Sequence, residues 1–146
     1  MLIFSNYNDI FDLLIGEEEK SLDAYNSMAR RSETLAQKKV LEQLSREEIR
    51  HIIHLKGLRR KYPGHQFANN FEVEAEQAEP DTVDLEKMSY QHILEFAIAE
   101  EKKSEYLYRH IAAQIKDQEV NDLFLKIAQQ EKKHRLQLEK MLSFEQ

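Results

Sequence analysis

The chain has 146 residues, the size of one domain (1–146), and 33% of them are charged while only three are glycine and two are proline, a composition typical of an α-helical protein. A net charge of −6 argues against a basic nucleic-acid surface, and without a signal-peptide pattern or an apolar run of about 20 residues we expect a cytoplasmic protein with no membrane segment. Because there is no cysteine, disulfides, iron–sulfur clusters and rubredoxin-type iron are excluded, and any metal must bind to histidine and carboxylate side chains.

Four helices are predicted from apolar residues that recur every three, four and seven positions. They span residues 8–31, 35–61, 90–115 and 118–143. At the start of each helix lies a side-chain oxygen that can cap the first turn, and we expect these residues as N-caps: Asn8, Thr34, Ser89 and Asp117. Residues 62–88 hold both prolines and the acidic stretch from Glu72 to Asp81, with no helical period. We expect this segment to be a solvated connection.

The chain contains two copies of one helical hairpin, related by an offset of 83 residues. In the first helix, the offset aligns Ile15, Glu17, Glu18, Ser21, Tyr25 and Ala29 with Ile98, Glu100, Glu101, Ser104, Tyr108 and Ala112. In the second helix, it aligns without a gap Leu41, Leu44, Glu48, His51 and Leu55 with Phe124, Ile127, Glu131, His134 and Leu138. Repeat one therefore spans about 8–61, the crossover about 62–88 and repeat two about 89–143.

Six polar residues lie within the apolar stripes of these helices: Glu18, Glu48, His51, Glu101, Glu131 and His134. At about 100° per residue, Glu18 for example has Leu14 and Leu22 within about 60° of it. The two glutamates of each hairpin are equally far from the turn that joins its helices, so antiparallel packing brings all six residues to one level. Four neighbours fall at the edge of the stripes and are expected to be partly exposed: Glu17, Glu19, Glu47 and Lys102.

Four ionised glutamates need cations if they are buried together, because a whole domain is stable by only about 5–15 kcal/mol. No lysine or arginine lies mid-stripe at this level, and Arg135 is the nearest candidate. Two divalent ions would balance the four carboxylates. Carboxylate oxygens with one imidazole per ion favour iron or manganese over structural zinc. The pattern therefore predicts a dinuclear site with these six residues as metal ligands.

Two tyrosines follow the first ligand of each repeat by two helical turns. Tyr25 and Tyr108 lie seven residues after Glu18 and Glu101, on the same helix faces. Each hydroxyl can reach a metal-bound carboxylate as a hydrogen-bond donor. The alternative is a core aromatic with some other hydrogen-bond partner.

The segments that carry these residues read IGEEEKSLDAYNSMA, LSREEIRHIIHL, IAEEKKSEYLYRHIA and IAQQEKKHRLQL. One glutamate from each of two helices and a Glu-x-x-His from each of the other two is the pattern of the ferritin-like di-iron carboxylate proteins. The segments resemble the rubrerythrin branch in particular, over all four helices. This resemblance implies an all-α, ferritin-like four-helix bundle of two antiparallel hairpins joined by a long crossover. It also implies a di-iron oxidoreductase that reduces peroxide or O₂ under oxidative stress.

Two departures from the rubrerythrin pattern bear on the implied chemistry. Rubrerythrins usually carry a further glutamate at the position of Ser104, and Glu105, about 40° from Glu101 on the helical wheel, is the candidate to replace it. They also carry a rubredoxin domain, for which this sequence has neither the residues nor the cysteines. Electrons would then come from a separate donor protein or from Fe(II) itself.

Two other functions stay open from the sequence. One is iron storage of ferritin type, which needs a hollow shell of many subunits. The other is a helical interaction module whose metal, zinc for example, is only structural. Because relatives at times exchange a hairpin between subunits, the resemblance also implies a homodimer, with or without such an exchange.

Overall fold

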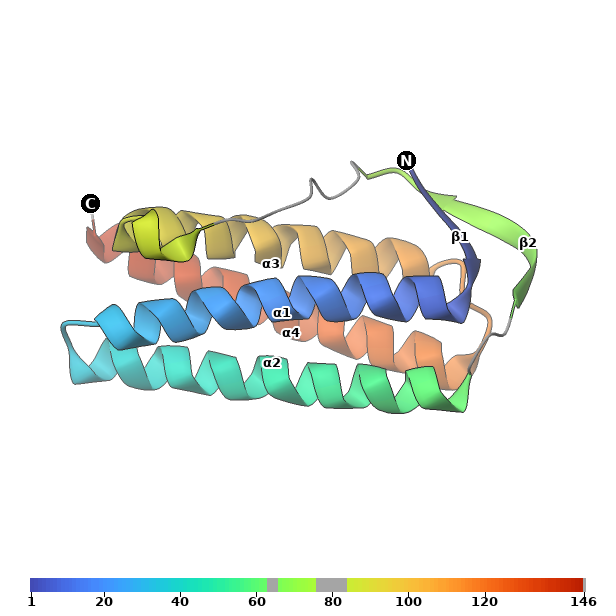
Figure 1. Ribbon diagram of the computed structural model, residues 1–146, viewed down its shortest axis with the longest axis horizontal. Helices are drawn as coiled ribbons and strands as arrows, with labels where there is room; N and C mark the ends of the chain where they lie inside the picture. The colour runs from blue at the N-terminus through green and yellow to red at the C-terminus, as the bar shows by residue number, and fades with distance from the viewer. Residues whose placement is uncertain (63–65, 76–83, 146) are drawn as a thin grey trace.

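The computed structural model describes residues 1–62, 66–75 and 84–145. Its elements are β1 (Leu2–Asn6), α1 (Tyr7–Arg31), α2 (Leu35–Lys61), β2 (Gln66–Val73), the 3-10 turn η1 (Leu85–Lys87), α3 (Tyr90–Ala112) and α4 (Gln118–Glu145). The predicted all-α four-helix bundle is confirmed (Figure 1). Helix ends agree with the prediction to within three residues, the largest difference being that α3 ends at Ala112.

Three of the four predicted helix caps are confirmed. The side-chain oxygens of Thr34, Ser89 and Asp117 each accept a hydrogen bond from the backbone N–H three residues later, at 3.2, 3.1 and 3.0 Å respectively. The prediction of Asn8 as a cap was wrong. Helix α1 begins at Tyr7, and Asn6 caps it by accepting from the Asp9 N–H at 2.9 Å. Asn6 is the last residue of a β-strand, so its backbone is already extended, as a cap requires.

The four helices form two antiparallel hairpins, α1–α2 and α3–α4, and α3 runs parallel to α2 (Figure 1). Helix α1 packs directly against α3, whereas α2 and α4 approach each other closely at few positions. The bundle is therefore tight on the α1/α3 side and wide on the α2/α4 side. Among the described residues, no helix is long and apolar enough to cross a membrane.

Residues 62–88 contain regular structure that the sequence reading did not predict. Strand β2 pairs antiparallel with β1, with Leu2 opposite Val73 and Phe4 opposite Phe71. The ribbon lies at the end of the bundle where α2 finishes (Figure 1). Phe4 and Val73 are 3% and 2% exposed and join the core there. In the acidic stretch from Glu72 to Asp81, Glu72 and Glu74 are exposed. Residues 76–81 lie outside the described part of the chain.

The apolar core is divided in two by a layer of polar side chains. One cluster lies toward the β-ribbon and includes Phe11, Tyr108 and Phe124. The other lies toward the α1–α2 turn and includes Met28 and Leu41. Because apolar side chains close the layer from both ends of the bundle, charged groups in it are shielded from bulk water.

Candidate metal centre

All six predicted ligand residues converge on the polar layer. The four carboxylates are fully buried, and His51 and His134 are 3% and 2% exposed. Their potential ligand atoms form two overlapping groups, in each of which the atoms lie within 4.8 Å of one another: Glu18, Glu48, His51 and Glu131, and Glu48, Glu101, Glu131 and His134. Glu48 and Glu131 belong to both groups. The structure therefore has two adjacent positions that could hold a metal ion, with two glutamates shared between them.

Each histidine turns Nδ1 into the layer. In His51 this atom lies 3.2 Å from Glu18 Oε2 and 3.0 Å from Glu131 Oε1. In His134 it lies 2.9 Å from Glu48 Oε1. The two rings stack with their centroids 6.1 Å apart and their planes inclined by 18°. The inward nitrogen of each ring is thus the one available to a metal.

The outward Nε2 atom of each histidine donates to the helix opposite. His51 Nε2 donates to Gln130 Oε1 and His134 Nε2 donates to Glu47 Oε2, both at 2.6 Å. A proton held on Nε2 leaves the lone pair of Nδ1 free for a metal. Sequence reasoning missed both partners, although they are repeat equivalents that directly precede the shared glutamates Glu48 and Glu131. The predicted partial exposure of Glu47 is confirmed, since its side chain is 34% exposed.

Both tyrosine hydroxyls donate to a glutamate of the layer, but across the repeats. Tyr25 donates to Glu101 Oε1 at 2.5 Å, and Tyr108 donates to Glu18 Oε1 at 2.8 Å. Burial, reinforced by the surrounding carboxylates, raises the pKa of both hydroxyls well above the ordinary value. Both tyrosines therefore stay protonated and orient the two glutamates that are not shared between the groups.

The layer is electrostatically strained when it holds no cation. Burial, followed by repulsion from the neighbouring carboxylates, raises the pKa of Glu48 and of Glu131 well above the usual range. Burial would also raise the pKa of Glu18, but its contacts with Glu48, His51 and Tyr108 outweigh burial and lower that pKa. Burial would lower the pKa of His134, but Glu101 and Glu47 raise it instead.

A family model described as rubrerythrin matches residues 9–142. The chain belongs to the rubrerythrin family. Comparison with curated proteins gave no match, and neither did comparison with solved structures. The matched range spans all four helices, so it contains each of the six residues of the polar layer. Rubrerythrin membership implies metal binding, typically of iron.

The donor set of this rubrerythrin-family chain fits two divalent ions. Glu48 Oε2, Glu101 Oε2 and Glu131 Oε2 are buried and accept no hydrogen bond from any described residue. Such atoms are costly to bury unless a cation or proton accompanies them. Four carboxylates carry the charge that two divalent ions neutralise, and among the described residues the six form ion pairs with one another and with Glu47, not with a lysine or arginine. The layer could therefore hold metal ions.

The position at which rubrerythrins usually add a glutamate holds a small, buried hydroxyl. Ser104 is fully buried, as is its repeat equivalent Ser21. Glu105 does not take over that place, because its carboxylate lies 3.1 Å from Arg109 and 3.5 Å from Arg135, outside both ligand groups. The two repeats thus contribute identical sets of ligands to the layer.

Glu17 is buried, contrary to the expectation of partial exposure. It is 2% exposed and its repeat equivalent Glu100 is 8% exposed, because the direct packing of α1 on α3 covers this edge of both helices. Lys103 Nζ lies 3.0 Å from Glu17 Oε1. Burial and the adjacent Glu17 carboxylate raise the pKa of Glu100 to about 8. At neutral pH, Glu100 therefore holds a proton that it shares with ionised Glu17.

The substitution Glu100→Gln is expected to stabilise the metal-free protein at pH 8.5 by roughly 2–4 kcal/mol and to change little at pH 5. A carboxyl whose folded pKa is raised contributes stability fully below its unfolded pKa and loses it as pH rises through the folded value near 8. The glutamine amide donates to Glu17 at every pH. Urea unfolding at both pH values measures the difference, with the exposed Glu95→Gln as control. Equal gains at both pH values would attribute the effect to packing.

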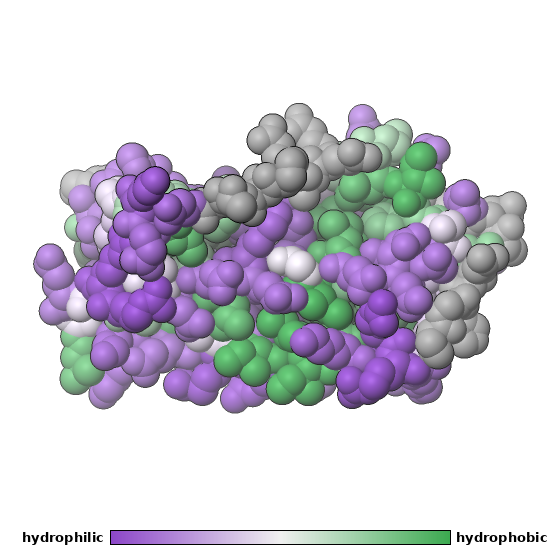
Figure 2. Space-filling model, in the orientation of Figure 1, coloured by the Kyte–Doolittle hydropathy of each residue, from purple (hydrophilic) through white to green (hydrophobic). Residues whose placement is uncertain are grey.

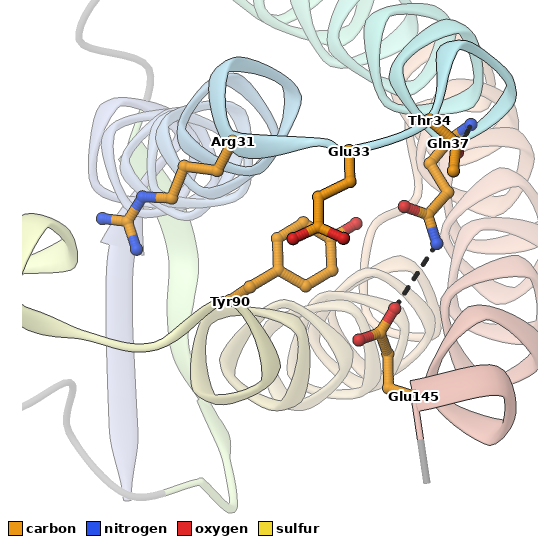
Figure 3. A pocket seen from close by; sticks show the side chains of 6 residues that line it. All are labelled: Arg31, Glu33, Thr34, Gln37, Tyr90 and Glu145. Carbon is orange, nitrogen blue, oxygen red and sulfur yellow. Dashed lines mark hydrogen bonds between the residues drawn. The ribbon is translucent and has the colours of Figure 1, made fainter.

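A separate hollow of about 290 Å³ lies at the end of the bundle that holds the α1–α2 turn (Figure 3). Its lining comes from the ends of several helices and includes Arg31, Glu33 and Tyr90, and Gln37 Nε2 donates to Glu145 Oε1 at 3.4 Å across it. Arg31 turns away from the hollow to donate to the backbone oxygens of Met88 and Leu85. The hollow does not contact the polar layer and supplies no ligand to it.

Proposed function

We propose that this member of the rubrerythrin family is a non-haem di-iron oxidoreductase that reduces peroxide or O₂ with electrons from Fe(II). The observation that carries the proposal is the pair of overlapping ligand groups, which share Glu48 and Glu131. Each group offers three carboxylates and one imidazole, an oxygen-rich set that suits Fe(II). Glu48 and Glu131, shared between the groups, would hold two ions next to each other, and such a pair would supply electrons to both oxygen atoms of one small substrate.

A pair of Fe(II) ions would supply the two electrons of the reaction H₂O₂ + 2 Fe(II) + 2 H⁺ → 2 H₂O + 2 Fe(III). The residues of the chain influence this reaction through their charge, through the orientation of the ligands and through the exclusion of water. The four carboxylates would neutralise two divalent ions but not two trivalent ones, so their charge would favour the reduced pair. Tyr25 and Tyr108 hold Glu101 and Glu18 in place, and the two apolar clusters keep bulk water away.

Return of the oxidised pair to Fe(II) requires electrons from outside these residues. The 146 residues contain no cysteine and therefore hold no rubredoxin-type iron site. The donor in this proposal is a separate redox protein, or free Fe(II) that exchanges with the bound ions.

The proposal is tested by loading the metal-free protein anaerobically with two equivalents of Fe(II) and then adding one equivalent of H₂O₂. We expect ferric absorption in the near ultraviolet to develop much faster than in buffer with Fe(II) alone, and one peroxide to oxidise two Fe(II). The exposed Glu19→Gln variant, altered next to Glu18, should behave like the parent. Oxidation no faster than in buffer would refute the redox role. Purified protein that contains zinc by elemental analysis, and unfolds when a chelator removes it, would favour a structural metal.

A homodimer is part of the proposal. The face formed by α1 and α2 is largely hydrophilic but carries a hydrophobic patch over its middle (Figure 2). On α2, Ile49 and Ile53 are 44% and 59% exposed. Exposed apolar side chains that gather on one face are typical of a surface that contacts another protein.

A further inference from the structure

Glu47 and Gln130 occupy equivalent positions in the two repeats but differ in charge. Glu47 on α2 accepts from His134 on α4, and Gln130 on α4 accepts from His51 on α2. Both hydrogen bonds are 2.6 Å long and both span the wide side of the bundle. The outward nitrogen of His134 thus donates to a carboxylate, and the outward nitrogen of His51 donates to a neutral amide.

This difference breaks the symmetry of the hydrogen bonds that the two histidines make on their outer side, within the residues that the structure describes. The six ligand residues match in pairs through the repeat offset. So do the two tyrosine hydroxyls, which donate to Glu101 and Glu18. The outer partners of the histidines are therefore a source of inequality between the two metal positions.

A carboxylate that accepts from the far nitrogen of an imidazole makes the near nitrogen a stronger metal donor than an amide does, because negative charge is transferred toward the ring. The Glu47 side chain is partly exposed to solvent. Glu47 and Gln130 both line two hollows at the surface, one of about 480 Å³ that also includes His134 and one of about 100 Å³ that also includes His51. Because these hollows open to solvent, water screens the charge of Glu47, so we expect only a moderate effect of Glu47 on metal affinity.

We propose that Glu47 makes the position at His134 the tighter of two metal positions, and that Gln130 leaves the position at His51 the weaker. The inference rests on the proposed function, since it needs a layer that binds two ions. It assigns Glu47 and Gln130 as positioning residues that act through the histidines. The protein would then bind its metals in two steps and give up the ion at His51 first.

The test is an anaerobic titration of the metal-free protein with Co(II), which is not oxidised under these conditions. The parent should bind two ions with dissociation constants at least tenfold apart. Glu47→Gln should weaken the first step by about 10–100-fold, and Gln130→Glu should tighten the second. The double exchange, E47Q with Q130E, should restore the separation, because it moves the carboxylate to the other histidine.

Proton NMR of the same samples separates positioning from a merely structural role. In the parent, the first equivalent of Co(II) should produce one strongly shifted imidazole N–H resonance, which changes in Glu47→Gln. In Gln130→Glu this resonance should keep its position while a second one joins it. The exposed Glu42→Gln variant on α2 is the matched control and should leave both steps unchanged.

Two ions bound in indistinguishable steps would overturn the inference and leave the two-metal site intact. An unchanged first step in Glu47→Gln would overturn it equally. A protein that binds no Co(II) and no Fe(II) would instead remove the proposed function, so the two failures are told apart by the number of ions bound.

Discussion

Two equivalents of Fe(II), added anaerobically to the metal-free protein at pH 7.5, are expected to raise its melting temperature by about 15–30 °C. An ion present at 1,000 times its dissociation constant stabilises the folded state by about 4 kcal/mol. Two ions contribute about twice that, and a domain of this size gains about 2–4 °C per kcal/mol. Differential scanning calorimetry with and without metal measures the change.

The size of this gain follows from the cost of the layer without metal. Glu48 and Glu131, whose pKa values lie well above the usual range, destabilise the fold when they ionise. For a carboxyl group with a raised folded pKa, stability is complete below the unfolded pKa and falls as pH rises. The metal-free protein should therefore lose stability from pH 5 toward pH 8. Metal reverses this trend, because ligands must lose their protons to bind it.

The gain from Fe(II) should accordingly be smaller at pH 5 than at pH 7.5, and a chelator should abolish it at both. Mg²⁺ at the same concentration is the control ion, since it prefers octahedral oxygen ligands and water over imidazole. A melting temperature that Fe(II) leaves unchanged at pH 7.5 would contradict a metal site in the buried layer.

The part of the fold that sequence could predict is the part set by local periodicity. Apolar spacing defined all four helices, and the 83-residue offset identified the two hairpins. The convergence of Glu18, Glu48 and His51 with their repeat equivalents also followed, because helix geometry fixes which side chains share a face and a level.

Non-local pairing is what the sequence did not reveal. Strand β1 has five residues and its partner β2 lies about 60 residues or more along the chain, so neither strand can be recognised from its own sequence. The wrong cap at Asn8 has the same cause, because Asn6 becomes the cap only once β1 brings the chain to it.

Contacts that depend on the spacing between helices were equally hidden. Glu17 and Glu47 lie near the edges of their stripes, where the wheel alone predicts partial exposure for both. Close packing of α1 on α3 buries Glu17, whereas the wider α2/α4 side leaves Glu47 partly exposed and within reach of His134. Distances between helices depend on every side chain at the interface, so a single wheel does not contain them.

The substitution Glu48→Gln is expected to have opposite effects on metal binding and on the stability of the metal-free protein. Because Glu48 belongs to both ligand groups, the loss of its charge should weaken binding at both positions, by more than about 100-fold for the pair. Glutamine keeps the size and shape of the side chain, whose Oε1 lies 2.9 Å from His134 Nδ1 in the parent. The glutamine amide can donate to the adjacent Glu18, whereas the Glu48 carboxylate of the parent repels Glu18. The metal-free variant should therefore melt about 5–10 °C above the metal-free parent at pH 8.

Isothermal titration with Co(II) and calorimetric melting at pH 5 and pH 8 measure the two effects on the same samples. The gain in melting temperature should nearly vanish at pH 5, where Glu48 in the parent is already protonated. Glu131→Gln is the repeat equivalent and should repeat the result, and the exposed Glu42→Gln should show neither effect. A variant that lost metal and stability together at pH 8 would make Glu48 a structural residue. A variant that loses metal and gains stability identifies Glu48 as a group kept for binding at a cost to the fold.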